Sequence, residues 1–192
     1  MPVNHGRLEF WRLRLVAMGW LVVGQRRLAL NTFGEMLRRW PRDAYALSSR
    51  AHLLAQLGRP EEAITDALAL TQAHPKRSAA DWFNLAFLLE DAARFEEAEA
   101  AFRSAVAIDP KLDRAWYGLG LVLIRLQRFE EAVQALKRNT ELQPMSPFGW
   151  YQLARIHVDR QDPDEARRII RHLKGFEPKI AAQLERETGL TH

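Results

Sequence analysis

The sequence contains no cysteine, and this absence excludes both a disulfide framework and thiol chemistry. The chain also lacks an uninterrupted apolar run of the about 20 residues that a membrane-spanning helix needs. No segment alternates apolar and polar residues as a half-buried strand would. We therefore expect an all-helical protein in a reducing compartment, which favours the cytoplasm. A periplasmic or membrane-peripheral location stays open.

The sequence also lacks the spacings of known catalytic and metal-binding motifs. Its six histidines form no His-Glu-x-x-His pair, and there is neither a phosphate-binding loop nor a Gly-x-Ser-x-Gly turn. Three pairs of adjacent glutamates each begin a predicted helix, where negative charge favours the positive helix end. These pairs are Glu61-Glu62, Glu96-Glu97 and Glu130-Glu131. We expect no catalytic residue, no metal site and no cofactor, and a chain that is not an enzyme.

What the sequence does contain is a period of 34 residues. Tryptophan, alanine and proline each recur three times at this step, and three residue types sharing one period predict a repeat array. The recurring residues are Trp82, Trp116 and Trp150, then Ala98, Ala132 and Ala166, then Pro110, Pro144 and Pro178.

Each repeating unit has the pattern of two amphipathic helices. In the unit at 79–112, helical spacing relates Trp82 to Leu89 in the first segment and Ala98 to Ala105 in the second. We expect at least ten helices, with turns inside the pairs near positions 24, 58, 92, 127 and 161. Small residues, among them Gly120 and Ala132, are expected where paired helices press together.

The pattern Trp-x-x-Leu-Gly, then Ala-x-x-x-Phe, then Pro resembles the tetratricopeptide repeat. The resemblance implies a right-handed solenoid of antiparallel helix pairs, with about five units in a single domain over 1–192. Arginine far outnumbers lysine, a composition that suggests a bacterial source. The expected units are 10–43, which is divergent, 44–78, 79–112, 113–146 and 147–180, followed by a cap helix at 178–188.

Local signals support these boundaries. Ser78, Ser146 and Asp162 stand where helix N-caps are expected, and Ser78 and Asp162 are followed three residues later by an acid. Some positions depart from the family pattern: Asn139 replaces an expected small residue, and an aromatic residue is usual where the chain has Leu89, Leu123 and His157.

The resemblance implies that the first helices of the units line a concave groove, with the residue after each tryptophan pointing into it. Aromatic and polar side chains there suit the capture of a protein or peptide partner. Packing between units, or occupation by the chain's own end, would also explain them. The candidate residues are Phe83, Asn84, Phe87, Arg114, Tyr117, Leu121, Arg125, Tyr151, Gln152 and Arg155.

The segment from Leu15 to Val23 is nearly all apolar and is bracketed by arginines. Apolar residues around a whole helix are more than one packed face requires. Burial in the fold, a partner or self-association surface, and indirect membrane contact all remain open. The candidate interface residues are Trp11, Trp20 and Val22.

The charge is concentrated at the start of the chain. Residues 1–43 hold eight arginines and three acids, a net charge of +5, whereas 44–192 hold twenty bases and twenty-one acids, a net charge of −1. A nucleic-acid binder more often shows a continuous basic stripe with interleaved aromatic residues, so nucleic acid is not favoured as a partner.

These observations predict a non-enzymatic adaptor or assembly factor that binds a partner segment in the groove. Two alternatives stay open. One is a secretion-type chaperone that shields an apolar client segment. The other is a structural subunit of a larger enzyme or membrane complex, docked through the apolar N-terminal helix.

Overall fold

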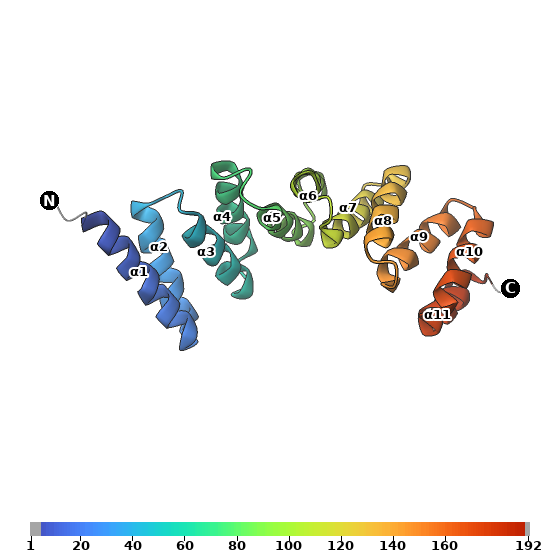
Figure 1. The fold of residues 1–192 in the computed structure, drawn as a ribbon, viewed down its shortest axis with the longest axis horizontal. Coiled ribbons are helices and arrows are strands. Elements are labelled where there is room, and N and C mark those ends of the chain that lie inside the picture. Colours follow the sequence, from blue (N-terminus) through green and yellow to red (C-terminus); the bar gives the residue numbers. More distant parts are fainter. Residues whose placement is uncertain (1–4, 191–192) are drawn as a thin grey trace. The chain divides into compact units, whose positions relative to one another are not determined.

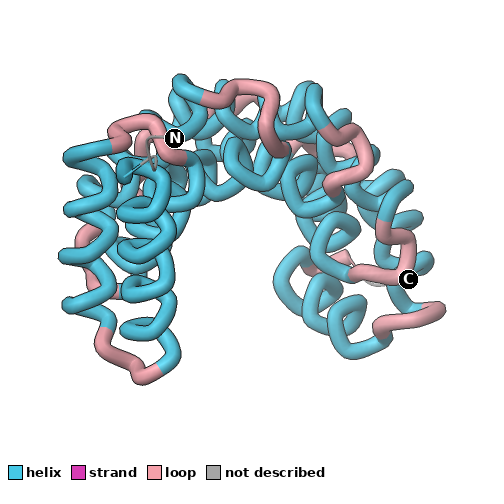
Figure 2. Tube along the Cα trace, turned by 60° about the vertical axis from the view of Figure 1, so that its left-hand side comes forward, coloured by secondary structure: helices cyan, strands magenta, loops and turns pink. Residues whose placement is uncertain are grey.

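The computed structural model describes residues 5–190, which form eleven helices and no strand (Figure 1). Short loops join successive helices (Figure 2). The all-helical prediction and the five turn positions are confirmed. The helices are α1 His5–Val22, α2 Arg26–Arg39, α3 Ala44–Gln56, α4 Pro60–Ala73, α5 Ala79–Asp91, α6 Phe95–Ile108, α7 Asp113–Arg125, α8 Phe129–Leu142, α9 Pro147–Asp159, α10 Pro163–Lys174 and α11 Pro178–Thr188.

The helices fall into two compact units. Helices α1 to α5 belong to the first, which ends at Arg94, and α6 to α11 belong to the second, which begins at Phe95. Helix α11 has the bounds expected of the cap helix. The single solenoid over 1–192 and its unit boundaries stay predictions.

The turn inside every helix pair has the same backbone geometry. One residue in each turn adopts a left-handed conformation, and the N–H of the next residue donates to a carbonyl five residues back, as Arg128 N does to Leu123 O at 2.9 Å. This is the Schellman arrangement, which satisfies carbonyls left open at a helix end. The left-handed residues are Gly24, Gly58, Ala93, Gln127 and Gln161.

Small residues allow the helices of the second unit to approach closely. A Cβ added to Gly120 on α7 would lie 2.6 Å from Leu136 Cγ on α8, and one added to Gly118 would lie 2.3 Å from the Phe102 ring on α6. Ala132 is fully buried. The expected role of Gly120 and Ala132 in close packing is therefore confirmed.

A hydrogen bond links the periodic tryptophans to the periodic prolines. The indole Nε1 of Trp116 donates to Pro110 O at 3.0 Å, and that of Trp150 donates to Pro144 O at 2.9 Å. In the first unit Trp82 makes the same bond to Pro75 O at 2.8 Å. Each bond ties the loop that closes one repeat to the first helix of the next.

Buried apolar residues from four helices, α1 to α4, form a core cluster of the first unit. Leu13 and Ala17 on α1 pack with Phe33 and Met36 on α2 and with Leu47 on α3. This is the face of α1 that the helical period predicts to be internal.

Two of the three expected N-caps bond their helices. Ser78 Oγ accepts from Ala80 N at 3.1 Å, and Asp162 Oδ1 accepts from Glu165 N at 3.4 Å. Asp162 also accepts from His157 Nδ1 at 3.0 Å, which satisfies the histidine that replaces the usual aromatic. Ser146 also stands at the N-cap of α9, as expected, but its side chain accepts no helix N–H. Pro147 lies in the first turn of α9 and has no backbone N–H, so this helix start has one fewer N–H group that needs an acceptor.

The reciprocal half of the expected capping box at Ser78 is wrong. The Asp81 carboxylate, which would reach back to the N-cap backbone, instead forms a bidentate pair with Arg77, at 2.8 Å from Nε and 2.5 Å from Nη2.

Gln127→Gly is expected to raise the free energy of unfolding by about 0.5–1 kcal/mol, because a left-handed φ of 58° strains every residue with a Cβ. Gln134→Gly, at an exposed position inside α8, serves as the matched control and is expected to lower it by about 1 kcal/mol. Urea unfolding measures both. Equal losses in the two variants would contradict this account of the turn.

Trp116→Phe is expected to lower the free energy of unfolding by about 1 kcal/mol, because phenylalanine cannot donate to Pro110 O. Trp11→Phe on the surface of α1 controls for the change in ring size, since that side chain is about half exposed. Thermal unfolding would compare the two. Equal shifts would show that the indole bond contributes nothing.

Candidate functional site

Four of the predicted groove residues lie along one face of α7. Arg114, Tyr117, Leu121 and Arg125 follow one another at steps of three, four and four residues, which places them side by side on a helix. Tyr117 and Leu121 are half-buried, whereas both arginines are exposed. The opposite side of α7 carries the buried Leu119 and Leu123, so packing fixes which face stays open.

Helix α9 adds an aromatic side chain that sequence reasoning missed. Phe148 is 66% exposed, and its ring centroid lies 6.4 Å from that of Tyr117 in an edge-to-face arrangement. We call Tyr117, Leu121 and Phe148 the α7–α9 patch. It presents apolar area on two neighbouring helices, with Arg114 and Arg125 at the ends of its α7 side.

Further along α9, the chain's own cap helix contacts two predicted groove residues. Tyr151 Oη donates to Glu187 Oε2 on α11 at 2.6 Å. Arg155 Nη1 donates to Tyr151 Oη at 3.3 Å and lies 3.6 Å from the same carboxylate oxygen. The bond to Tyr151, aided by Gln183 and Arg155, lowers the pKa of Glu187. The remaining α9 candidate, Gln152, is half-buried.

The first unit holds the other three predicted groove residues, all on α5. Phe83 is half-buried, Asn84 is exposed and Phe87 is 51% exposed. Phe83 and Phe87 are four residues apart and share a helix face. This pair forms an aromatic surface within the first unit.

The candidate N-terminal interface residues separate into two environments. Trp11 and Val22 are exposed on α1. Trp20 is half-buried and packs against the core of the first unit. The structure therefore places Trp11 and Val22 on the surface, whereas Trp20 packs against the core cluster of the first unit.

Sequence reasoning also missed a buried ion pair in the first unit. Arg50 on α3 donates to both oxygens of Asp66 on α4 at 2.6 Å, and Asp66 is 3% exposed. The bond to Asp66 raises the pKa of Arg50. Both residues line a pocket of about 630 Å³. The signal was available, since Arg50 stands where the later units carry Leu85 and Leu119.

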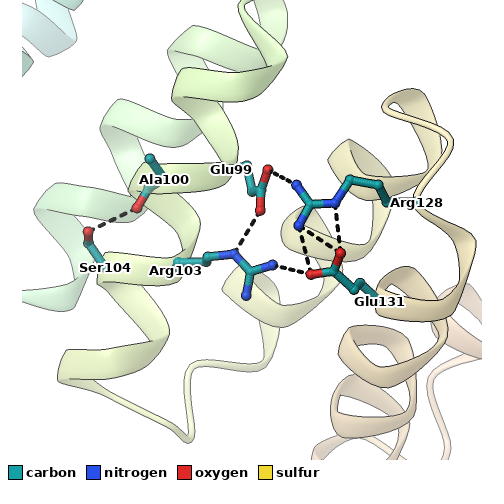
Figure 3. Close-up of polar contacts among 6 residues, drawn as sticks. All are labelled: Glu99, Ala100, Arg103, Ser104, Arg128 and Glu131. Carbon is teal, nitrogen blue, oxygen red and sulfur yellow. Dashed lines mark hydrogen bonds and ion pairs between the residues drawn. The ribbon is translucent and has the colours of Figure 1, made fainter.

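A cyclic network of charges joins the second helices of two repeats in the second unit (Figure 3). Arg103 donates to Glu99 at 2.8 Å and to Glu131 at 2.7 Å, while Arg128 donates to Glu99 at 2.6 Å and to Glu131 at 2.7 Å. The two arginines satisfy both carboxylates, with Arg128 foremost in lowering the pKa of Glu131. The network is therefore a link between helices.

Two features are absent from the described residues, a metal-binding cluster and a membrane-spanning helix. Between residues 5 and 190, no group of three or more histidine, aspartate or glutamate side chains is placed to hold a metal ion. In the same part of the chain, no helix is long and apolar enough to cross a membrane.

Family models assign the fold that these helix pairs form. Models of the tetratricopeptide repeat match residues 21–78, 89–147 and 147–172, which together cover most of the chain. The chain belongs to the tetratricopeptide repeat family. The resemblance inferred from its periodic residues is thereby confirmed. A search of curated protein sequences found no match.

Solved structures share this tetratricopeptide fold at low sequence identity. A crystal structure of MamA protein is 17% identical, with a TM-score of 0.82, over 95% of this chain and 97% of that one. MamA from residue 41 onward from Desulfovibrio magneticus is 21% identical, with a TM-score of 0.75, over 94% and 97%. YrrB, described as a tetratricopeptide repeat protein with an unusual peptide-binding site, is 16% identical, with a TM-score of 0.79, over 88% of each chain.

Glu187→Gln is expected to reduce the loss of stability on acidification. A carboxyl whose pKa is lowered by folding stabilises the fold above its unfolded pKa of about 4.3, and this contribution disappears as the pH falls through the lower, folded value. Wild type and variant should therefore differ at pH 7 and converge as the pH falls below the unfolded pKa and through the lower, folded one, as measured by urea unfolding. Glu141→Gln, at an exposed ion pair on α8, controls for the loss of one negative charge. A parallel pH dependence of wild type and Glu187→Gln would contradict the assignment.

Proposed function

We propose that this chain is a non-enzymatic interaction module that binds a segment of a partner protein on the α7–α9 patch. The observation that carries the proposal is Phe148, which is two-thirds exposed beside Tyr117 on the neighbouring helix. Exposed aromatic rings supply large contact area at low entropic cost, and such residues dominate the energetics of protein interfaces.

The charges around the patch indicate what kind of segment it would bind. Arg114 and Arg125 are exposed at the two ends of the α7 face, one turn beyond Tyr117 and Leu121 respectively. Arginines at the rim of an interface attract acidic residues and speed association. A partner segment with apolar side chains flanked by acids fits this arrangement. YrrB, which shares the fold, is described as having an unusual peptide-binding site, and this analogy supports the proposal.

Of the alternatives, the complex subunit has an observation in its favour. Large apolar side chains remain exposed along α1, among them Leu15 and Val22. A contiguous apolar surface of this kind is unusual on a soluble monomer and indicates contact with another molecule. An adaptor that is itself docked into a complex would use both surfaces.

Peptides selected from a random displayed library against the purified chain test the proposal. We expect apolar peptides with flanking acids, and we expect Phe148→Ser and Tyr117→Ala each to weaken their binding about tenfold or more, because a buried aromatic anchor contributes over 1.4 kcal/mol. Fluorescence anisotropy measures the affinity, and circular dichroism checks the fold. Met145→Ser removes an equally exposed apolar side chain from the preceding loop and serves as the matched control.

Arg114→Glu with Arg125→Glu should shift the selection from acidic toward basic peptides. Peptides that bind both aromatic variants as tightly as wild type, with the fold intact, would place the binding surface elsewhere.

A further inference from the structure

Helix α1 presents a straight apolar stripe to solvent. Its five residues are separated by three, four, three and four positions, the spacing of a helix seam that packs against another helix. Leu15 at the centre is 65% exposed and Val22 near the end is 86% exposed. The residues of the stripe are Leu8, Trp11, Leu15, Met18 and Val22.

Part of the exposed side of α1 is covered on the equivalent helix of the second unit. Leu13 of α1 corresponds in the repeat to Trp116 of α7, so Leu15 corresponds to Gly118 and Val16 to Leu119. The Phe102 ring of the preceding helix α6 lies against Gly118, and Leu119 is 2% exposed. Val16 is 43% exposed. The side of α1 around Leu15 and Val16 is therefore the side on which α7 receives α6. The stripe residues Trp11, Met18 and Val22 correspond to Arg114, Leu121 and Arg125, which remain accessible on α7 as well.

A glycine beside the stripe leaves further room for such a helix. Gly19 lies inside α1, where glycine costs about 1 kcal/mol relative to alanine. Nothing lies within 4 Å of the position that its Cβ would take, whereas the Cβ positions of Gly118 and Gly120 are filled by side chains of neighbouring helices. Within the described fold, then, close packing gives no reason for a glycine at this position.

The charges around the stripe are mostly positive. Arg7 and Arg12 flank its first half, and Arg26 and Arg27 follow its last residue. Between residues 5 and 31 the sequence holds one acid, Glu9, which pairs with both Arg39 and Arg12. Pairing α1 with α1 of a second copy would bring arginine against arginine, which disfavours self-association.

We propose that α1 docks an amphipathic helix of a partner protein, whose apolar seam packs on the stripe and whose flanking residues are glutamate or aspartate. Opposite charges beside an apolar seam set which helices pair and in which orientation. This interface is separate from the α7–α9 patch, so either surface can be present without the other.

A designed peptide of four heptads, with leucine at the seam positions and glutamate at the flanking positions, is the probe. Its repelling glutamates keep it from pairing with itself, and its length makes it helical. A second peptide with lysine at the flanking positions is the matched control. Anisotropy of each labelled peptide, titrated with the full chain, measures binding.

We expect saturable binding of the glutamate peptide and about tenfold or weaker binding of the lysine peptide. Leu15→Glu should weaken binding of the glutamate peptide about tenfold or more. Met145→Glu, at an equally exposed residue of the second unit, should leave it unchanged. Arg12→Glu should reduce the preference for the glutamate peptide over the lysine peptide. All of these titrations are made in the Tyr117→Ala background, because the proposed α7–α9 patch also fits apolar side chains flanked by acids and would otherwise add a second site for the probe.

Three results would overturn the proposal. One is that the glutamate peptide binds the chain no better than the lysine peptide does, or that it binds the Leu15→Glu variant as tightly as it binds wild type. Another is that the chain binds no peptide but sediments with phosphatidylglycerol vesicles, and that Leu15→Glu abolishes this sedimentation. That result would assign the stripe to a bilayer surface. The third is a mass by light scattering that doubles with concentration in wild type and not in Leu15→Glu, which would assign it to a second copy.

Discussion

The bond from each periodic tryptophan indole to a proline carbonyl is the interaction that most directly links one repeat to the next. Where Leu47 replaces the tryptophan, apolar packing between α2 and α3 joins the two helix pairs instead. Trp116 and Trp150 each reach back to the carbonyl of the proline that closed the previous repeat. The tryptophan ring also covers the loop, and the proline prevents the preceding helix from continuing into it. Two of the three periodic residue types are thus the donor and acceptor of one contact, which explains why they share a period.

The fold was predictable because most of its constraints repeat. Helical spacing, the small residue at Gly120 and the closing prolines all recur, and the register of the units follows from them. The left-handed turn residue was less visible, since the first two turns use Gly24 and Gly58 whereas the later turns use residues such as Gln127. A glutamine in that conformation has no sequence signature, because the Schellman bonds made by the backbone determine it.

The candidate site was only partly predictable, because binding residues stand outside the repeat. Tyr117 and Leu121 could be found as neighbours of periodic positions. Phe148 could not, since it follows Pro147 at a helix start where the repeat imposes no pattern. The contact between Tyr151 and Glu187 joins residues 36 positions apart through a cap helix that carries no repeat motif. The Arg50–Asp66 pair was missed although its charges occupy positions that the later units fill with apolar residues.

The helices at the two ends of the described chain show how stacking and binding can be told apart. The terminal element of a repeat protein stays soluble by carrying a polar outer face. Helix α11 follows that rule: its buried residues are Ala181 and Leu184, and no large apolar side chain of its described residues is exposed. Helix α1 breaks it, with the stripe centred on Leu15 open to solvent. Packing within the fold accounts for α11 completely and for only one face of α1. The unaccounted face is therefore where selection for contact with another molecule is most directly visible.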